Sequence, residues 1–408
     1  MVHNFLGPYG GAETVVYKQY DLLKSQGYSV FLFGSNYKPR FFEDLPHEDL
    51  FPSHTNYDNL QGVAQKFNAL LKPFGNKEAE NNFRAFLKEV NPDLVHFHSV
   101  FWHLSASVIQ PCVEMKIPIV MTLHETRLIC PSGTLMRSGQ TYCKDLLCAT
   151  QGAWHAIKHR CYEKSLAKSI LVAAEFKYRT VHKLFDQVNQ FICPSKALRD
   201  LLVHSGVHDS RVSVIPNFID DSWMDLPKPE KKGNYFLFAG RISREKGLHS
   251  LMQALYELDG TVPVKIAGDG PEAANIKKTA KQLNLKNIEF LGFVKSSAMY
   301  SLYQNAIANI LPCNWFESFG LSIIESYAAG RPCIASSIGG IADLIDHEKT
   351  GYLIPTDNIK ALKNAITACV DQPNHTFEMG KLGQTFIKNN FNKFIFLEKY
   401  QSLVRSLT

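Results

Sequence analysis

Long apolar segments and strong charge of either sign are both missing from this sequence of 408 residues. No apolar run reaches the roughly 18 residues that a membrane-spanning helix needs, and the chain does not open on a charged and then apolar leader. The formal net charge is only +6, and basic residues are not grouped with stacking aromatic residues as they are in nucleic-acid-binding modules. We therefore expect a cytoplasmic globular protein that does not bind nucleic acid.

The composition is that of an ordinary folded protein, with 45% apolar and 20% charged residues. A chain of 408 residues can form two domains, each with its own hydrophobic core. Nine cysteines are present, and two of them, Cys193 and Cys333, lie inside apolar segments. We expect these two to be reduced core residues.

The most informative stretch covers residues 306–325. An apolar run ends at a proline, a polar aromatic loop follows, and an amphipathic helix begins near Leu321, which predicts a strand, a loop and a helix. Gly320 allows the backbone to approach a ligand closely, and the first amides of the helix favour an anion. Glu317 in the loop and Glu325 in the helix could accept hydrogen bonds from sugar hydroxyls. Two solvated carboxylates are the alternative.

This stretch resembles the family 4 glycosyltransferases of the GT-B architecture, whose C-terminal halves carry E-x-F-G-L-x-x-x-E followed by A-x-G-x-P. Here the first motif runs from Glu317 through Phe319, Gly320 and Leu321 to Glu325, and the second is Ala-Ala-Gly-Arg-Pro. The resemblance covers nearly the whole chain. It implies that Glu317 is catalytic and that Phe319, Gly320, Leu321 and Glu325 bind substrate.

Strands and helices alternate in both halves, which predicts two doubly wound, Rossmann-like α/β domains facing a cleft. We expect an N-terminal acceptor-side domain over residues 1–220, a linker over residues 221–233 and a C-terminal nucleotide-sugar-binding domain over residues 234–389. The resemblance implies that the final helix, from about residue 390 to residue 408, packs back on the first domain.

The resemblance implies a retaining glycosyltransferase that moves a sugar from a nucleoside diphosphate sugar to a hydroxyl acceptor without a protein nucleophile. No Asp-x-Asp occurs in the chain, so a metal-bridged pyrophosphate is not expected and catalysis should need no cofactor. An apolar strand over residues 235–239 leads to Arg241 and Lys246, which could neutralise the leaving diphosphate. In the resembled family they have this catalytic role; a solvated surface is the alternative.

Two further loops of the second half are expected at the substrate. Gly268 and Gly270 lie in the strand and loop over residues 262–271, and we include both among the substrate-binding residues. Phe293 and Val294 follow the next predicted strand. The resemblance implies that this second loop meets the nucleotide base through its backbone.

A short strand, a glycine-rich turn and a helix to about residue 26 open the chain, as at the ligand edge of a parallel sheet. The resemblance implies that this turn lies beside the donor phosphates, with Gly10 and Gly11 allowing close approach. A tight turn without a ligand is the alternative. Because related sequences have a few apolar residues before this point, we keep open a start further upstream.

Histidines end two short predicted strands at the same edge of the first domain. His96 and His98 lie in a short strand and loop over residues 93–99, and His124 ends the strand over residues 117–124. The resemblance implies that His98 is a catalytic residue that contacts the sugar and that His124 binds substrate. Histidines with a purely structural role are the alternative.

Four cysteines lie within one loop-rich stretch. Cys130, Cys143, Cys148 and Cys161 could together hold a tetrahedral structural zinc ion. The spacing Cys-x4-Cys between the second and third is looser than in the usual zinc knuckle. Scattered reduced thiols are therefore the alternative.

Residues 151–183 hold seven Lys or Arg against two Glu, interleaved with apolar residues. Such a face is either an ordinary solvated surface or a dock for anionic lipid or a pyrophosphate-linked acceptor. Residues 35–92 give no clear strand signal and are helical in pattern over residues 60–90, and we expect an acceptor-side insertion there. We expect peripheral contact with the inner face of the plasma membrane and a lipid-linked saccharide of a surface polysaccharide as the acceptor.

Two other functions fit the same motifs. A nucleotide-sugar epimerase of related fold would turn over its substrate without an acceptor. A noncatalytic partner subunit would bind the nucleotide sugar without transferring the sugar.

Overall fold

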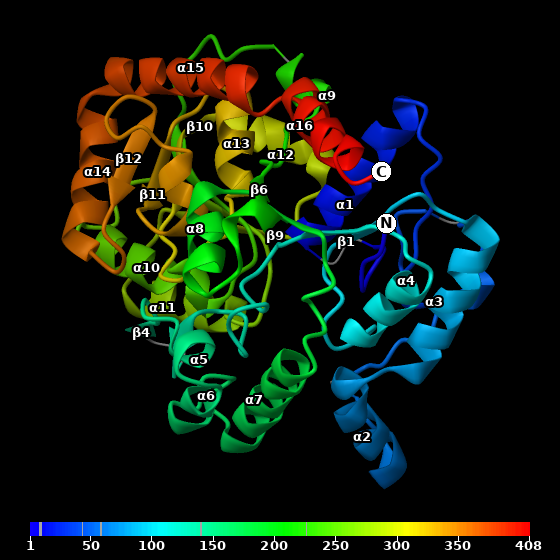
Figure 1. The fold of residues 1–408 in the computed structure, drawn as a ribbon. Coiled ribbons are helices and arrows are strands. Elements are labelled where there is room, and N and C mark those ends of the chain that lie inside the picture. Colours follow the sequence, from blue (N-terminus) through cyan, green and yellow to red (C-terminus); the bar gives the residue numbers. More distant parts are fainter. Residues whose placement is uncertain (8–9, 43, 58, 139–140, 226) are drawn as a thin grey trace. The chain divides into compact units, whose positions relative to one another are not determined.

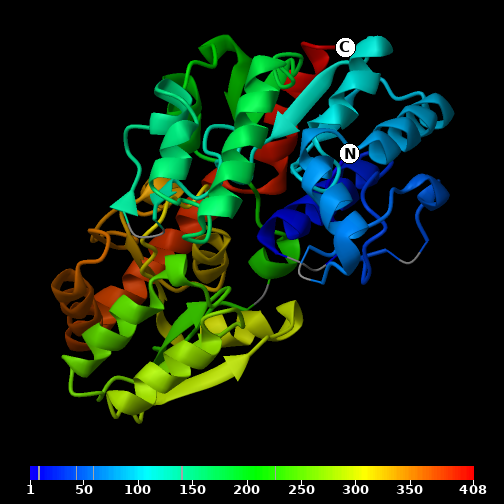
Figure 2. The same cartoon turned by 90° about the horizontal axis from the view of Figure 1, so that it is seen from below.

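Helices and strands alternate along the chain in the computed structural model (Figures 1 and 2). The structure describes residues 1–7, 10–42, 44–57, 59–138, 141–225 and 227–408. These residues form two compact units. Unit 1 comprises Met1–Pro194, Leu198–Ile215 and Glu398–Thr408, and unit 2 comprises Ser195–Ala197 and Pro216–Leu397.

Unit 1 is built on a parallel sheet with the strand order β1-β2-β5-β6. Val2 adds to this sheet, because it pairs in parallel with Phe97 on one side and with Phe33 on the other. The chain therefore leaves the centre of the sheet in both directions, which is the doubly wound arrangement. The strands are β1 (Val95–Phe97), β2 (Ile119–Thr122), β5 (Gln190–Cys193) and β6 (Val212–Val214).

Residues 28–33 have an apolar pattern that predicts a strand, but the structure forms only a single bridge there, at Phe33. The segment from Met1 to Asn4 lies alongside it: Phe33 N–H donates to the carbonyl of Met1, and His3 N–H donates to the carbonyl of Phe33. A β-propensity pattern becomes a strand only where a partner backbone can complete the ladder. Most of residues 28–32 lack such a partner, so this prediction was too long.

The helix α3 (Lys77–Val90) shows why helices cover this sheet. Its buried side chains are Ala79, Phe83, Phe86 and Leu87, which recur at the spacing of one helix face. The ring of Phe83 lies 4.7 Å from the ring of Phe33, a residue of the sheet. The other helices of this part of the chain are α1 (Gly11–Ser25), α2 (Gly62–Leu71), α4 (Gln110–Glu114), α5 (Leu147–Thr150), α6 (Trp154–Lys158), α7 (Leu166–Val181) and α8 (Lys196–His204).

Between β2 and α7 the chain contains little regular structure. A two-stranded antiparallel ribbon joins β3 (Met136–Arg137) to β4 (Thr141–Tyr142), and the short helices α5 and α6 follow. This is the loop-rich stretch that carries the four cysteines.

Unit 2 is built on a six-stranded parallel sheet with the order β12-β11-β10-β7-β8-β9. This is the strand order of the Rossmann fold, and the direction of winding reverses between β7 and β10. The expected pair of doubly wound domains is thus confirmed. The strands are β7 (Tyr235–Ala239), β8 (Val264–Ala267), β9 (Ile288–Gly292), β10 (Ala306–Leu311), β11 (Cys333–Ser336) and β12 (Gly351–Ile354).

The sequence analysis did not predict β12. β12 has only four residues and pairs with β11 along its whole length. Gly351 permits this pairing at close range, since a Cβ there would lie 2.2 Å from the carbonyl oxygen of Cys333. So short a strand is specified by its neighbour more than by its own pattern.

The remaining helices surround this sheet and end the chain. None of the described helices is long and apolar enough to cross a membrane. α9 lies within the predicted linker, and α16 runs across the boundary between the residue ranges of the two units. The helices are α9 (Asp221–Met224), α10 (Leu248–Tyr256), α11 (Ala273–Gln282), α12 (Ser296–Gln304), α13 (Leu321–Ala328), α14 (Ile359–Asp371), α15 (Pro373–Asn390) and α16 (Lys393–Arg405).

Candidate active site

Two predicted site residues of unit 2 form an ion pair where the winding of the sheet reverses. The Nζ atom of Lys246 lies 2.5 Å from Oε2 of Glu317, although the lysine follows β7 and the glutamate follows β10. Ligands of doubly wound sheets bind outside the carboxyl ends of the strands at such a point. The fold thus brings these two residues together at the position expected for a ligand.

The environment of this ion pair keeps the lysine charged. Both side chains are largely buried, with exposed fractions of 18% for Lys246 and 19% for Glu317. Burial is the largest single influence and opposes the charged ammonium, but Glu317, together with smaller contributions from Cys313 and Glu245, outweighs burial, so the pKa of Lys246 is raised. The ammonium also lies 5.8 Å from the centroid of the Trp315 ring. A permanent positive charge therefore stands at the ligand edge of the sheet.

Glycines allow the loops after β7, β8 and β10 to pack closely. Gly268 has a φ angle of 150°, and a Cβ there would lie 1.8 Å from the carbonyl oxygen of Gly240. A Cβ at Gly270 would lie 2.4 Å from the carbonyl oxygen of Ile242, in the loop after β7. Gly247 has a φ angle of 72°, and a Cβ there would lie 1.8 Å from the carbonyl oxygen of Pro312. These glycines shape the site, and substrate contact by Gly268 or Gly270 stays a prediction.

Glu325 lies in α13 and accepts a hydrogen bond from a tyrosine that the sequence analysis missed. The hydroxyl of Tyr303 donates to Oε2 of Glu325 at 3.0 Å. Burial, and then the carboxylate, raise the pKa of Tyr303 well above its usual value, so the phenol keeps its proton. Gly320, with a φ angle of 111°, is the N-cap of this helix, and Leu321 is its first residue. A carboxylate and the start of a helix therefore occupy the same loop-to-helix turn, as predicted.

The other predicted residues of unit 2 differ in their exposure. Arg241 is exposed directly after β7, and Val294 is half-buried after β9. Phe293 is 78% exposed. In contrast, Phe319 is buried, with its ring 5.9 Å from the ring of Phe391. The Phe319 side chain is thus part of the core, and a substrate contact would have to come from its backbone.

In unit 1, His98 and His124 follow β1 and β2 at their carboxyl ends, and His96 within β1 packs against His98. Nδ1 of His98 lies 2.9 Å from Nε2 of His124, and the two rings stack 5.2 Å apart. The ring of His96 stacks on His98 at 4.2 Å and is held by Thr122 at 2.7 Å and by Tyr400 at 3.1 Å. Nε2 of His98 is buried and finds no hydrogen-bond partner among the described residues. The fold therefore places the two predicted histidines in contact.

Burial keeps these imidazoles neutral. It lowers the pKa of His124 to about 3, with a smaller contribution from His3. The pKa values of His96 and His98 lie well below the usual range, chiefly because of burial and then because of neighbouring histidines and the N-terminal amine. A neutral imidazole offers one donor and one acceptor. The group suits hydrogen bonds to sugar hydroxyls better than attraction of an anion by charge.

His3 and Glu13 form a buried pair that the sequence analysis did not single out. Nε2 of His3 lies 2.9 Å from Oε1 of Glu13, and the backbone N–H of Ser99 donates to Nδ1 of His3 at 3.0 Å. Because Nδ1 accepts, Nε2 carries the proton and donates to the carboxylate. Only the parallel pairing of Val2 with Phe97 brings this histidine to the same strand ends.

The glycine-rich turn lies directly before α1. Gly10 is the N-cap residue of this helix and Gly11 is its first residue, and both are exposed. Pro8 and Tyr9, the other members of the predicted turn, lie outside the described residues. Contact of this turn with phosphates therefore stays a prediction.

The four cysteines predicted to bind zinc line one small pocket of unit 1, together with mainly apolar side chains. All four are free thiols: Cys130, Cys143, Cys148 and Cys161. Burial raises the pKa of Cys148 to about 12 and that of Cys161 to about 11, so both thiols are protonated. As the described residues stand, no three His, Cys, Asp or Glu side chains are placed to hold a metal ion. Zinc binding thus stays a prediction, to be tested by metal analysis.

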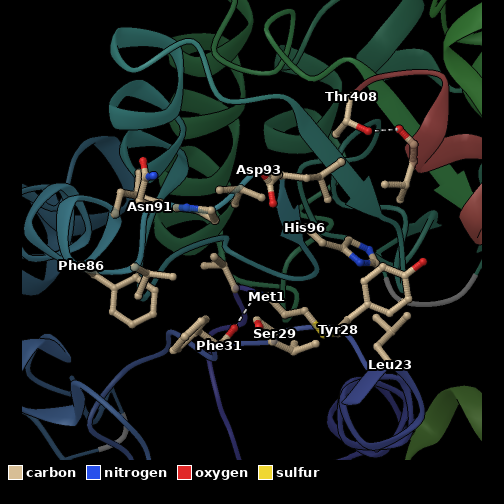
Figure 3. Close-up of a pocket in the computed structure, with 18 of the residues that line it drawn as sticks. Met1, Leu23, Tyr28, Ser29, Phe31, Phe86, Asn91, Asp93, His96 and Thr408 are labelled. Atoms are coloured by element: carbon tan, nitrogen blue, oxygen red, sulfur yellow. Dashed lines mark hydrogen bonds between the residues drawn. The ribbon is translucent and has the colours of Figure 1, made fainter. Parts of the chain in front are cut away.

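Another pocket of unit 1, of about 490 Å³, lies at the opposite ends of the strands (Figure 3). Its lining includes Leu23, Phe31, Phe86 and His96 and contains none of the predicted site residues. The amine of Met1 donates to the carbonyl of Phe31 at 2.7 Å inside it. Because doubly wound sheets bind ligands at their carboxyl edge, this pocket is not the candidate active site.

Two family models match adjoining parts of the sequence. "Glycosyltransferase Family 4" matches residues 9–223, more than half of the chain, and "Glycosyl transferases group 1" matches residues 221–390. The chain belongs to glycosyltransferase family 4. The resemblance stated from the motifs is thereby confirmed.

Curated relatives of this family 4 member are glycosyltransferases with different substrates. The D-rhamnosyltransferase WbpZ of Pseudomonas aeruginosa is 36% identical over 155 residues, which are 37% of this chain and 40% of that protein. A glycogen synthase of Mycobacterium tuberculosis is 26% identical over 288 residues, or 69% of this chain and 61% of the synthase. The chain thus spans less than two thirds of the length of either relative.

Solved structures support the GT-B fold over the full length of the chain. The sucrose-phosphate synthase of Thermosynechococcus elongatus matches with a TM-score of 0.71 at 17% identity, covering 100% of this chain and 98% of its own. HepE of Anabaena, solved with UDP and glucose, matches with a TM-score of 0.68 at 16% identity and the same coverage. At such identities the likeness concerns the fold alone. The expected GT-B fold is confirmed.

Proposed function

We propose that this protein is a retaining glycosyltransferase that moves a sugar from a nucleoside diphosphate sugar to a hydroxyl of its acceptor. The observation that carries this proposal is the Lys246–Glu317 ion pair at the carboxyl ends of β7 and β10. A buried cation suits a diphosphate that gains charge as it leaves, and a carboxylate beside it suits the sugar hydroxyls.

In the proposed reaction, the bond between the anomeric carbon and the diphosphate oxygen breaks, and its electron pair leaves with the diphosphate. Lys246 and the exposed Arg241 stabilise that charge. The acceptor oxygen attacks from the face that the diphosphate leaves, and its proton passes to the departing phosphate oxygen. This scheme needs neither a metal ion nor a protein nucleophile.

Two carboxylates of unit 2 divide the binding of the donor in this proposal. Glu325, held by the hydroxyl of Tyr303, accepts hydrogen bonds from the ribose. Glu317 accepts hydrogen bonds from the transferred sugar. The neutral pair of His98 and His124 in unit 1 offers further donors and acceptors for sugar hydroxyls.

Surface polysaccharide or glycoconjugate synthesis is the proposed setting. Besides the rhamnosyltransferase of Pseudomonas aeruginosa, an O-antigen chain mannosyltransferase of Escherichia coli is 28% identical over 176 residues. A nucleoside diphosphate sugar is the proposed donor class; HepE, which shares the fold, has been solved with UDP and glucose. A lipid-linked saccharide is the proposed acceptor.

A panel of nucleotide sugars, each incubated with the protein and with hydroxyl acceptors, tests the proposal. One donor should release free nucleoside diphosphate together with a glycosylated product, and proton NMR should find the anomeric configuration of the donor retained. A product of opposite configuration would refute retention. Conversion of the nucleotide sugar without any acceptor would instead establish the epimerase, and binding without turnover would establish the noncatalytic subunit.

A further inference from the structure

Glu125 lies in the loop that follows β2, and its carboxylate is held in place from two sides. The hydroxyl of Ser99 donates to Oε1 of Glu125 at 3.1 Å, and Nε of Arg127 lies 3.5 Å from Oε2. Ser99 and Glu125 each come directly after one of the two paired histidines. Their hydrogen bond therefore joins the loops that follow β1 and β2, at the edge of the sheet where doubly wound domains bind ligands.

The carboxylate of Glu125 stays accessible although it is held. Its side chain is 32% exposed, against 15% for the side chain of Arg127, so this ion pair presents more of its negative partner to solvent. Each carboxylate oxygen can accept two hydrogen bonds. Ser99 uses one of these on Oε1, and Arg127 faces Oε2. Both oxygens therefore keep capacity for a hydrogen bond from a ligand.

The rest of this loop packs tightly against the ion pair. Gly133 has a φ angle of 73°, and a Cβ there would lie 3.3 Å from Oε2 of Glu125 and 3.2 Å from a terminal nitrogen of Arg127. The hydroxyl of Thr126 donates to the carbonyl of Gly133 at 2.9 Å. A glycine thus lets the backbone pass close to both charged groups, and neither side chain has much freedom to turn away.

Arg127 is in turn held by a strained turn after β1. The backbone N–H of His103 donates to the carbonyl of Phe101 at 2.9 Å around Trp102, whose φ angle is 71°. This is the rare and strained form of the γ-turn. The centroid of the indole ring lies 5.7 Å from the guanidinium carbon of Arg127, and the ring stacks on Tyr162 at 5.8 Å. Strained backbone of this kind is concentrated at ligand sites.

Arg179 of α7 fixes the same loop, although the sequence analysis counted it in the basic face over residues 151–183. It is buried and pairs with Glu175 at 3.2 Å. Its guanidinium donates to the carbonyl of Leu128 at 3.3 Å and also to the carbonyl of Arg127. Nη1 of Arg127 is buried and finds no hydrogen-bond partner in the part of the chain that the structure describes. Because buried donors are normally paired, an oxygen atom of a ligand would complete this group.

We propose that Glu125 binds hydroxyls of the acceptor and restricts the acceptor group that unit 1 holds to an uncharged saccharide. A fixed, partly exposed carboxylate accepts hydrogen bonds from sugar hydroxyls, and its charge disfavours a phosphate, sulfate or uronate group beside it. Arg127 offers little counter-attraction, because it faces the carboxylate and the indole and is less exposed. The inference rests on the proposed sugar transfer, since only that reaction makes the bound saccharide an acceptor.

Binding of the full chain to an array of immobilised saccharides, without any nucleotide sugar, tests this proposal. The wild type should bind uncharged oligosaccharides about ten-fold or more better than sulfated or uronate-containing ones. E125A should lose about ten-fold or more of this binding, because the hydrogen bonds to a charged acceptor are gone. E125Q keeps the shape and one acceptor oxygen, so it should bind uncharged saccharides only several-fold more weakly and bind acidic ones better than the wild type does. It also stays informative if E125A does not fold.

The matched control removes another carboxylate of unit 1. Glu114 of α4 is exposed and pairs with Arg84 at 3.0 Å, and E114A should bind like the wild type. A wild type that binds none of the saccharides, an equal loss in E114A, or an E125Q protein with the wild-type preference for uncharged saccharides would overturn the proposal. Release of nucleoside diphosphate from the panel of nucleotide sugars tests the transfer separately. Release without saccharide binding would overturn only the role of Glu125, whereas saccharide binding without release would overturn only the proposed transfer.

Discussion

Mild acid should destabilise unit 1 through the histidines at the carboxyl ends of β1 and β2. His124 has a pKa of about 3 in the folded protein because of burial, against about 6.5 in an unfolded chain. The folded state holds the neutral form. Its contribution to stability is therefore fully present above pH 6.5 and is lost as the pH falls toward 3.

The size of the effect follows from these two pKa values. Between pH 7.5 and pH 5, His124 becomes protonated in the unfolded chain but stays neutral in the folded protein. This difference lowers the free energy of unfolding by about 2 kcal/mol. His103, whose pKa burial also lowers to about 3, contributes a similar amount. His96 and His98 shift in the same direction.

Hydrogen exchange of the β1 and β2 amides, corrected for the intrinsic effect of pH, measures this loss within unit 1. His124→Asn should lose about 2 kcal/mol less than the wild type between pH 7.5 and pH 5. His204→Asn, a substitution of an exposed histidine of α8, is the control and should keep the wild-type slope. A wild type whose protection is flat over this range, or a His124→Asn protein with the full slope, would refute the reasoning.

The remaining predictions concern the two candidate sites. Lys246→Ala should slow transfer roughly 100-fold or more, since it removes a preorganised cation from the departing diphosphate. Arg241→Ala should act in the same direction. Normal turnover in Lys246→Ala would contradict this role. Glu325→Ala should mainly weaken nucleotide affinity in a calorimetric titration, whereas Glu317→Ala should mainly lower turnover of bound donor, and equal loss of affinity in both would count against this division. Protein purified without chelator should contain one zinc per chain if the four cysteines bind metal, and a content well below one equivalent would rule the site out.

A matched control accompanies the lysine substitution. Lys349 is exposed and pairs with Asp346 at 3.0 Å on the surface of unit 2. Lys349→Ala removes the same charge from the same unit and should leave turnover unchanged. Tyr303→Phe should weaken nucleotide binding in the same sense as Glu325→Ala but less, because the carboxylate stays and loses only the hydrogen bond that orients it.

Local signals in the sequence were enough for most of the fold. β7, β10 and β11 lie where their apolar runs predict them, because buried parallel strands read as continuous apolar segments. Gly320 ends the predicted loop and Glu325 lies in the predicted helix, since glycine and a helix start are strong local features. Short edge elements were the exception: Phe33 keeps one bridge of its predicted strand, and β12 was missed.

The sequence by itself determined the alternation of strands and helices, the motif from Glu317 to Glu325 and the residue types at the ligand edge. Only the tertiary structure decided which of them meet. Lys246 pairs with Glu317 across 71 residues of sequence, and His3 joins the histidine group through a parallel strand pairing. It also decided that Phe319 and Arg179 are buried while α2 stays exposed. Such pairings and burial depend on strand order and packing between distant segments, which local patterns do not encode.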